Sequence, residues 1–60
     1  MPNIDEITDM ARRLGIKLTN AEEGSELFKC WADRVLMAWN DAERGWPIGD
    51  RIAEANVYAI

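Results

Sequence analysis

A long stretch with no proline and with helical spacing of its apolar residues constrains this sequence most. No proline occurs from residue 21 to residue 44, and the next one is Pro47. At 100° per residue, eight apolar residues of the stretch fall within an arc of about 140°. They are Leu27, Phe28, Trp31, Ala32, Val35, Ala38, Trp39 and Ala42. The pattern predicts one long amphipathic helix, about 36 Å in length at a rise of about 1.5 Å per residue.

The start of this helix has two overlapping signals. Thr19 with Glu22, and Asn20 with Glu23, each match the capping box in which a polar first residue is followed three positions later by Glu. We therefore expect the helix to begin near residue 20. Either Thr19 or Asn20 is the expected capping residue, and the two signals do not decide between them. Gly24 is a poor helix former inside the first turn, so any fraying is expected there.

A shorter helix is predicted on each side of the long one. Asn3 followed by Glu6 forms a capping box for a helix over residues 4–14, and Gly15 suits its C-terminal cap. After Pro47, an apolar stripe predicts a third helix over about 48–58. With the long helix at about 20–44, these are the three predicted elements.

The lengths of the helices predict an all-α fold, a small three-helix arrangement around one long central amphipathic helix. Residues 1–60 are expected to form one helical domain, because a chain of 60 residues is too short for two. A domain of this size buries only about 60% of its unfolded surface, so self-association into a dimer is one expected supplement. The predicted core consists of Leu27, Phe28, Trp31, Val35 and Trp39 together with Ile4, Ile7, Leu14 and Ile52.

The composition argues against an enzyme. The chain has no histidine, and Ser25 and Cys30 are its only serine and cysteine. Acid–base and nucleophilic catalysis both require an activated group with a positioned partner, and none is recognisable. Carboxylate pairs such as Asp5 and Asp9 lie where a helix dipole favours negative charge, which explains them without a metal. We therefore expect no catalytic residue, no metal and no cofactor.

Charge and targeting signals favour the cytoplasm. The chain has 11 acidic and 7 basic residues, for a net charge of −4, which disfavours nucleic-acid backbones and anionic membranes. Its longest apolar run, residues 35–39, is far shorter than the roughly 20 residues of a membrane span. The N-terminal residues lack the pattern of a signal peptide, and a lone cysteine is typical of a reducing compartment.

Five residues are predicted to contact a partner. Trp39 lies near the edge of the apolar arc, Trp46 lies in the expected turn, and Leu36 widens the arc on one flank. Tryptophans in such positions are common interface anchors, although each of the two could also belong to the core. Cys30 and Met37, seven residues apart on the opposite side of the helix, indicate either a second, smaller seam or scattered surface residues.

The segment Met10-Ala11-Arg12-Arg13-Leu14-Gly15-Ile16 resembles the first helix and turn of bacterial helix-turn-helix proteins. The resemblance covers about seven residues and implies a second helix, directly after the turn, that reads the DNA major groove. The helix-turn-helix pattern has a further apolar position after the turn, and here it is occupied by the small Ala21. Three carboxylates follow, at Glu22, Glu23 and Glu26. Carboxylates at the start of a recognition helix oppose the approach to phosphates.

The favoured function is therefore a small non-enzymatic protein-binding module. Such a chain would act as an adaptor or inhibitor by occluding a partner protein, in the style of phage proteins directed at host targets. The partners expected are another protein and a second copy of the chain. A DNA-binding regulator and a purely structural homodimer are the alternatives.

Overall fold

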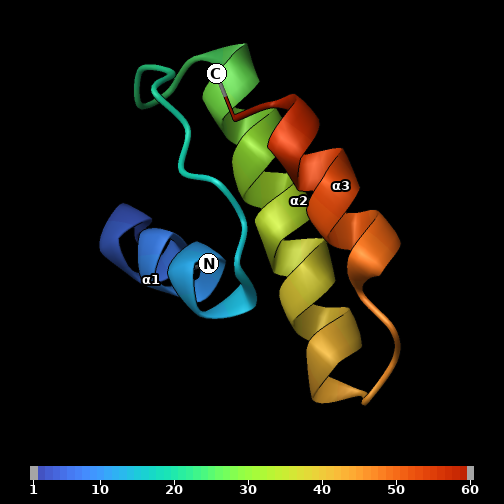
Figure 1. Ribbon diagram of the computed structural model, residues 1–60. Coiled ribbons are helices and arrows are strands. Elements are labelled where there is room, and N and C mark those ends of the chain that lie inside the picture. Colours follow the sequence, from blue (N-terminus) through green and yellow to red (C-terminus); the bar gives the residue numbers. More distant parts are fainter. Residues whose placement is uncertain (1, 60) are drawn as a thin grey trace.

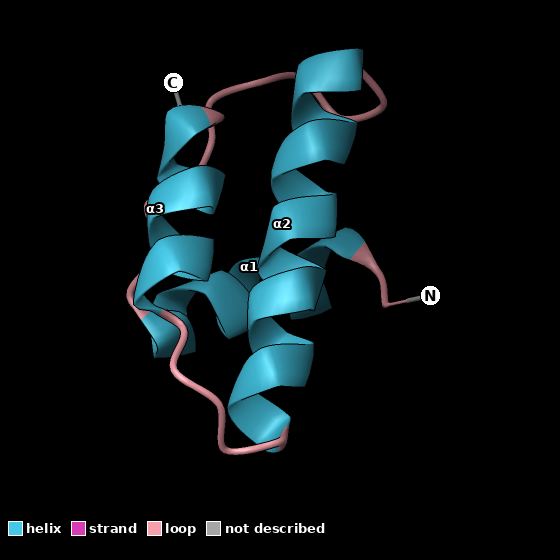
Figure 2. Cartoon of the chain, turned by 90° about the vertical axis from the view of Figure 1, so that its right-hand side faces the viewer, coloured by secondary structure: helices cyan, strands magenta, loops and turns pink. Residues whose placement is uncertain are grey.

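The protein is described by a computed structural model covering residues 2–59, in which three α-helices and no strand are present. They are α1 (Ile4–Leu14), α2 (Glu26–Glu43) and α3 (Gly49–Val57). Helices α2 and α3 run antiparallel side by side, and α1 crosses α2 beside its middle (Figures 1 and 2). The predicted all-α, three-helix fold is confirmed.

Helix α1 has the predicted ends because its signals are local. The side-chain oxygen of Asn3 accepts a hydrogen bond from the Glu6 N–H at 2.9 Å, as an N-cap residue does. At the other end Gly15 has φ of 80°, the left-handed conformation that glycine adopts without steric penalty. The Ile16 N–H then donates to the Ala11 carbonyl at 2.9 Å, which folds Ile16 back into the core.

The predicted start of the long helix near residue 20 is wrong. Helix α2 begins at Glu26, and its N-cap is Ser25, whose hydroxyl accepts a hydrogen bond from the Phe28 N–H at 3.1 Å. Gly24, with φ of 87°, lies outside the helix and turns the chain into it. The helix therefore has 18 residues and a length of about 27 Å.

The predicted capping residue Thr19 has a different role. Its hydroxyl accepts a hydrogen bond from the Ala21 N–H at 3.0 Å and donates one to the Tyr58 carbonyl at 3.2 Å. The same loop is held by Lys17, whose N–H donates to the Asn56 side chain and whose carbonyl accepts from the Trp31 indole, both at 2.9 Å. Residues 15–25 thus form a strap attached to α2 and α3.

Helix α3 spans Gly49–Val57, one residue shorter at each end than predicted. It is joined to α2 by an ion pair in which Arg51 Nε lies 2.9 Å from Asp41 Oδ2. The Ile48 carbonyl accepts the first intrahelical bond, from the Ile52 N–H at 2.9 Å. Among the helices of residues 2–59, none is long and apolar enough to cross a bilayer.

Small side chains make up half of the core. The buried residues are Ile7, Ala11, Ile16, Trp31, Ala32, Val35, Ala38 and Ala55. Of the predicted core, Ile7, Trp31 and Val35 are buried, whereas Leu14, Phe28 and Ile52 are partly buried and packed against that cluster. Leu27, Trp39 and Ile4 are partly buried but lie outside the cluster, so their assignment to the core is wrong. The buried alanines lie on all three helices and let the helices approach one another closely around Trp31 and Val35.

Candidate protein-binding surface

Trp46 is presented to solvent by the turn between α2 and α3. Its backbone N–H donates to the Asp41 carbonyl at 2.9 Å, and Gly45, with φ of 76°, gives the turn its direction. The guanidinium of Arg44 lies over the indole, 4.9 Å from the ring centroid. Although its backbone is held in this way, 55% of Trp46 is exposed. A cation–π contact of this kind contributes about 0.5–1 kcal/mol at an exposed site and restricts the ring.

Leu36 and Trp39 lie on α2, both partly buried. Leu36 packs against the core cluster, whereas Trp39 does not. The C-terminal part of α2 extends beyond α1 and has only α3 beside it (Figure 1). We name Leu36, Trp39 and Trp46 the tryptophan region, because all three belong to this part of α2 or to the turn that follows.

Cys30 and Met37 lie elsewhere on α2. Met37 and Trp39 are separated by about 200° around the helix, so they occupy opposite sides. Both Cys30 and Met37 are partly buried, and the Met37 sulfur accepts a hydrogen bond from Arg34 at 3.5 Å. The five predicted contact residues therefore do not form one surface but divide into the tryptophan region and a separate seam.

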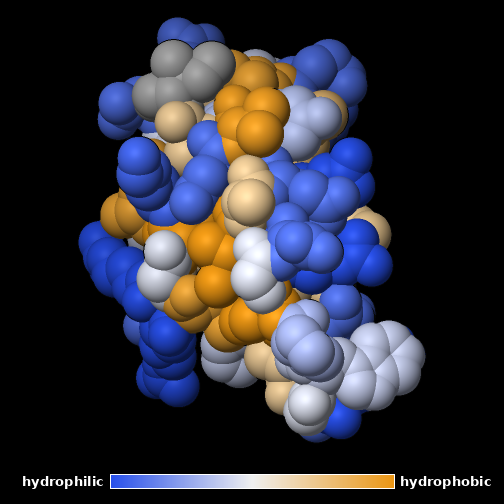
Figure 3. All heavy atoms as spheres, turned by 45° about the vertical axis from the view of Figure 1, so that its right-hand side comes forward, coloured by the Kyte–Doolittle hydropathy of each residue, from blue (hydrophilic) through white to orange (hydrophobic). Residues whose placement is uncertain are grey.

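Apolar side chains also reach the surface where α3 faces the viewer in Figure 3. They form a band through the middle of that face, with hydrophilic side chains on both flanks. Among residues 2–59 and outside the tryptophan region, Leu18 is 40% exposed and Val57 is 73% exposed. Val57 was not among the predicted contact residues.

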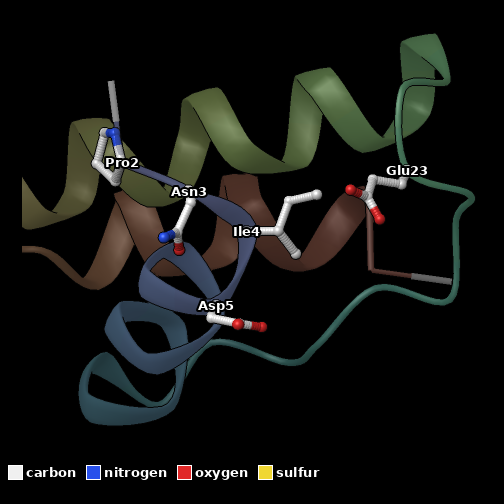
Figure 4. Close-up of a pocket in the computed structure, with 5 residues that line it drawn as sticks. All are labelled: Pro2, Asn3, Ile4, Asp5 and Glu23. Carbon is white, nitrogen blue, oxygen red and sulfur yellow. The ribbon is translucent and has the colours of Figure 1, made fainter.

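A hollow at the start of α1 is open to solvent. It has a volume of about 490 Å³ and is lined by Pro2, Asn3, Ile4, Asp5 and Glu23. The carboxylates of Asp5 and Glu23 lie on either side of the Ile4 side chain (Figure 4). Nowhere in residues 2–59, this hollow included, do three or more metal-ligating side chains come together.

A second pocket, of about 220 Å³, lies between α2 and α3 and is lined by Arg34, Glu54, Val57 and Tyr58. It is on the Met37 side of α2. Next to it, hydrogen bonds from Arg51 to Asp41 and then to Glu54 raise the pKa of the guanidinium above its ordinary value. Arg34 lies four residues after Cys30 and three before Met37, so these three residues share one stripe of α2.

The structure departs from a helix-turn-helix. In that motif the second helix follows a turn of about three or four residues. Here the ten residues from Ile16 to Ser25 contain no helix, and α2 begins only at Glu26. The resemblance of Met10–Ile16 is thus confined to α1 and its C-terminal turn.

No protein-family model, no curated protein and no solved structure matches this chain. No residue therefore takes a role from a relative. Support for a function comes from the exposure, contacts and charge of the chain's own side chains.

Proposed function

We propose that the chain is a small protein-binding module without catalytic activity, which acts as an adaptor or inhibitor by occluding its partner through the tryptophan region. The observation that carries the proposal is Trp46, which is 55% exposed while its backbone and ring are both held in place. An indole in such a position is a typical anchor residue of protein interfaces.

The energy available from Trp46 is large enough for an anchor. A tryptophan side chain offers roughly 150–250 Å² of surface, of which the exposed 55% corresponds to about 80–140 Å². At about 25 cal/mol per Å², complete burial would contribute about 2–3 kcal/mol. Because Arg44 already restricts the ring, little side-chain entropy is lost on binding.

Trp39 and Leu36 supply the rest of the proposed contact. Both are partly buried on α2, and Trp39 lies outside the core cluster. A groove or flat apolar surface on the partner could receive them together with the turn. The mode resembles the docking of an amphipathic helix, in which side chains three or four residues apart act as anchors.

The test is affinity capture of partners from the native host lysate with the purified chain. The Trp46→Ala variant, and the double variant that also carries Trp39→Ala, should lose at least about tenfold in affinity for the captured protein. Leu18→Ala is the matched control, because Leu18 is 40% exposed but lies in the loop before α2. Unchanged capture by the Trp46 variants would contradict the proposal.

Two further measurements separate the alternatives. Sedimentation equilibrium of the purified chain distinguishes a monomer from a homodimer, and a dimer broken by Trp46→Ala would make a second copy the partner. A mobility shift of duplex DNA at about 50 mM salt, abolished by neutralising Arg12 and Arg13, would instead favour the DNA-binding regulator.

A further inference from the structure

The pocket between α2 and α3 lies apart from the tryptophan region. Its lining residue Arg34 and the anchor Trp39 are about 140° apart around α2. The pocket has a volume of about 220 Å³, and its other lining residues are Glu54, Val57 and Tyr58 of the α3 end. A ligand in this pocket would therefore leave the tryptophan region uncovered.

Arg34 is partly buried without a carboxylate partner. Its guanidinium lies 5.8 Å from the centroid of the Tyr58 ring, and its Nη1 donates to the Met37 sulfur at 3.5 Å. No ion pair within residues 2–59 includes Arg34. A thioether is a weak acceptor, so most of the five N–H donors of this side chain have no strong partner in the chain. No buried side-chain nitrogen of residues 2–59 lacks a hydrogen-bond partner, so the remaining donors of Arg34 face solvent, where an anion can reach them.

The acidic residue that lines the pocket, Glu54, is already paired with Arg51. Glu54 Oε1 lies 3.2 Å from Arg51 Nη1, and the same Arg51 binds Asp41 through Nε at 2.9 Å. These bonds turn the Glu54 carboxylate toward Arg51. The pocket therefore combines one guanidinium that lacks an anion with an apolar wall made by the Tyr58 ring and by Val57, which is 73% exposed.

We propose that this pocket binds the C-terminal residue of a partner polypeptide that ends in an aliphatic side chain. The α-carboxylate would form paired hydrogen bonds with the Arg34 guanidinium, whose planar fork matches a carboxylate. The aliphatic side chain would lie against Val57 and Tyr58.

A terminal residue fits this site better than an internal acidic one. In a terminal residue the carboxylate and the side chain leave the same carbon, so both can reach groups as close together as Arg34 and Tyr58. A cavity of about 150 Å³ accommodates a benzene ring, and about 220 Å³ is enough for one aliphatic residue with its carboxylate. An aspartate or glutamate would instead carry its only side chain to the guanidinium and leave the apolar wall uncovered.

The test is a titration of the ¹⁵N-labelled chain with the peptide acetyl-Gly-Gly-Leu as the free acid, followed by amide chemical shifts. We expect saturable shifts at Arg34, Val57 and Tyr58 with a dissociation constant on the order of 1 mM. The same peptide with an amidated C-terminus should bind at least about tenfold more weakly, because it lacks the charge-assisted hydrogen bonds. A third peptide, acetyl-Gly-Asp-Leu amide, carries its carboxylate on a side chain.

Variants of the chain provide the second arm. Arg34→Gln should weaken binding of the free acid at least about tenfold, and Arg34→Lys should retain part of it, since it keeps the charge but loses the fork. Arg12→Gln, which removes an exposed charge from α1, is the matched control and should bind as the wild type does. Equal binding of acid and amide, equal binding of the aspartate peptide, or no shift at about 10 mM would each overturn the proposal. None of these results would affect capture through Trp46.

Discussion

Trp31 provides the sharpest test of how this fold is held together. It is 1% exposed, and its indole N–H donates to the Lys17 carbonyl at 2.9 Å, which attaches the strap to α2. Replacing Trp31 with Phe keeps an aromatic ring but removes this donor. The lost hydrogen bond should cost about 0.5–1.5 kcal/mol. Two fewer buried carbons should cost about 1.6 kcal/mol more, so the total is about 2–3 kcal/mol.

This is a large part of the stability of so short a chain. At about 0.05–0.15 kcal/mol per residue, 60 residues correspond to a free energy of unfolding of roughly 3–9 kcal/mol. For a domain of this size each kcal/mol shifts the melting temperature by about 4–8 °C. Trp31→Phe should therefore lower the melting temperature by roughly 10–20 °C, measured by circular dichroism, and lower the urea midpoint accordingly.

Trp46→Phe is the matched control for this experiment. The same chemical change at a side chain that is 55% exposed should alter the free energy of unfolding by no more than about 0.5 kcal/mol. A Trp31→Phe variant as stable as the wild type would refute the assigned burial and hydrogen bond. Equal losses in the two variants would show that both indoles are buried.

Three further changes test particular contacts. Ser25→Ala should destabilise the chain by about 1 kcal/mol in urea titrations by removing the N-cap of α2, whereas Asn20→Ala, at the start expected from the sequence, should be nearly neutral. Gly24→Ala should cost about 1–2 kcal/mol in the same assay, because φ of 87° is unfavourable for an L-residue. Arg51 bonded to Asp41 has a raised pKa, so the stability it contributes is fully present below the ordinary arginine pKa and is lost only above it. The difference in unfolding free energy between wild type and Arg51→Gln should therefore be the same at about pH 7 and about pH 10, and a decline over that interval would contradict the assignment.

The sequence was sufficient for α1 because all of its determinants are neighbours in the chain. Asn3, Gly15 and the apolar stripe act within one or two helical turns. The start of α2 was not predictable in the same way. Thr19 matches a capping residue, but its hydroxyl finds an acceptor at Tyr58, 39 positions away, which no local pattern reveals.

The candidate site was predictable only in part. Helix spacing separates Trp39 from Met37 on α2, and the structure keeps them apart. The exposure of Trp46 depends on how Gly45 turns the chain and on the position of Arg44 over the ring, which are consequences of the folded turn. The pocket at Arg34 needed the position of α3, because Val57 and Tyr58 reach it only when the two helices pack antiparallel.

The composition of the core links stability to binding in this chain. Four of its eight buried residues are alanines, each of which removes little apolar surface from water. Large side chains such as Trp39 and Trp46 contribute less than full burial would allow. A partner that covers them would stabilise the folded state by RT ln(1 + [L]/Kd), or about 2.7 kcal/mol at a concentration of 100 Kd. For a domain with a stability of only a few kcal/mol, the proposed partner should therefore raise the melting temperature measurably, and Trp46→Ala should remove that increase, measured against the melting temperature of the free variant.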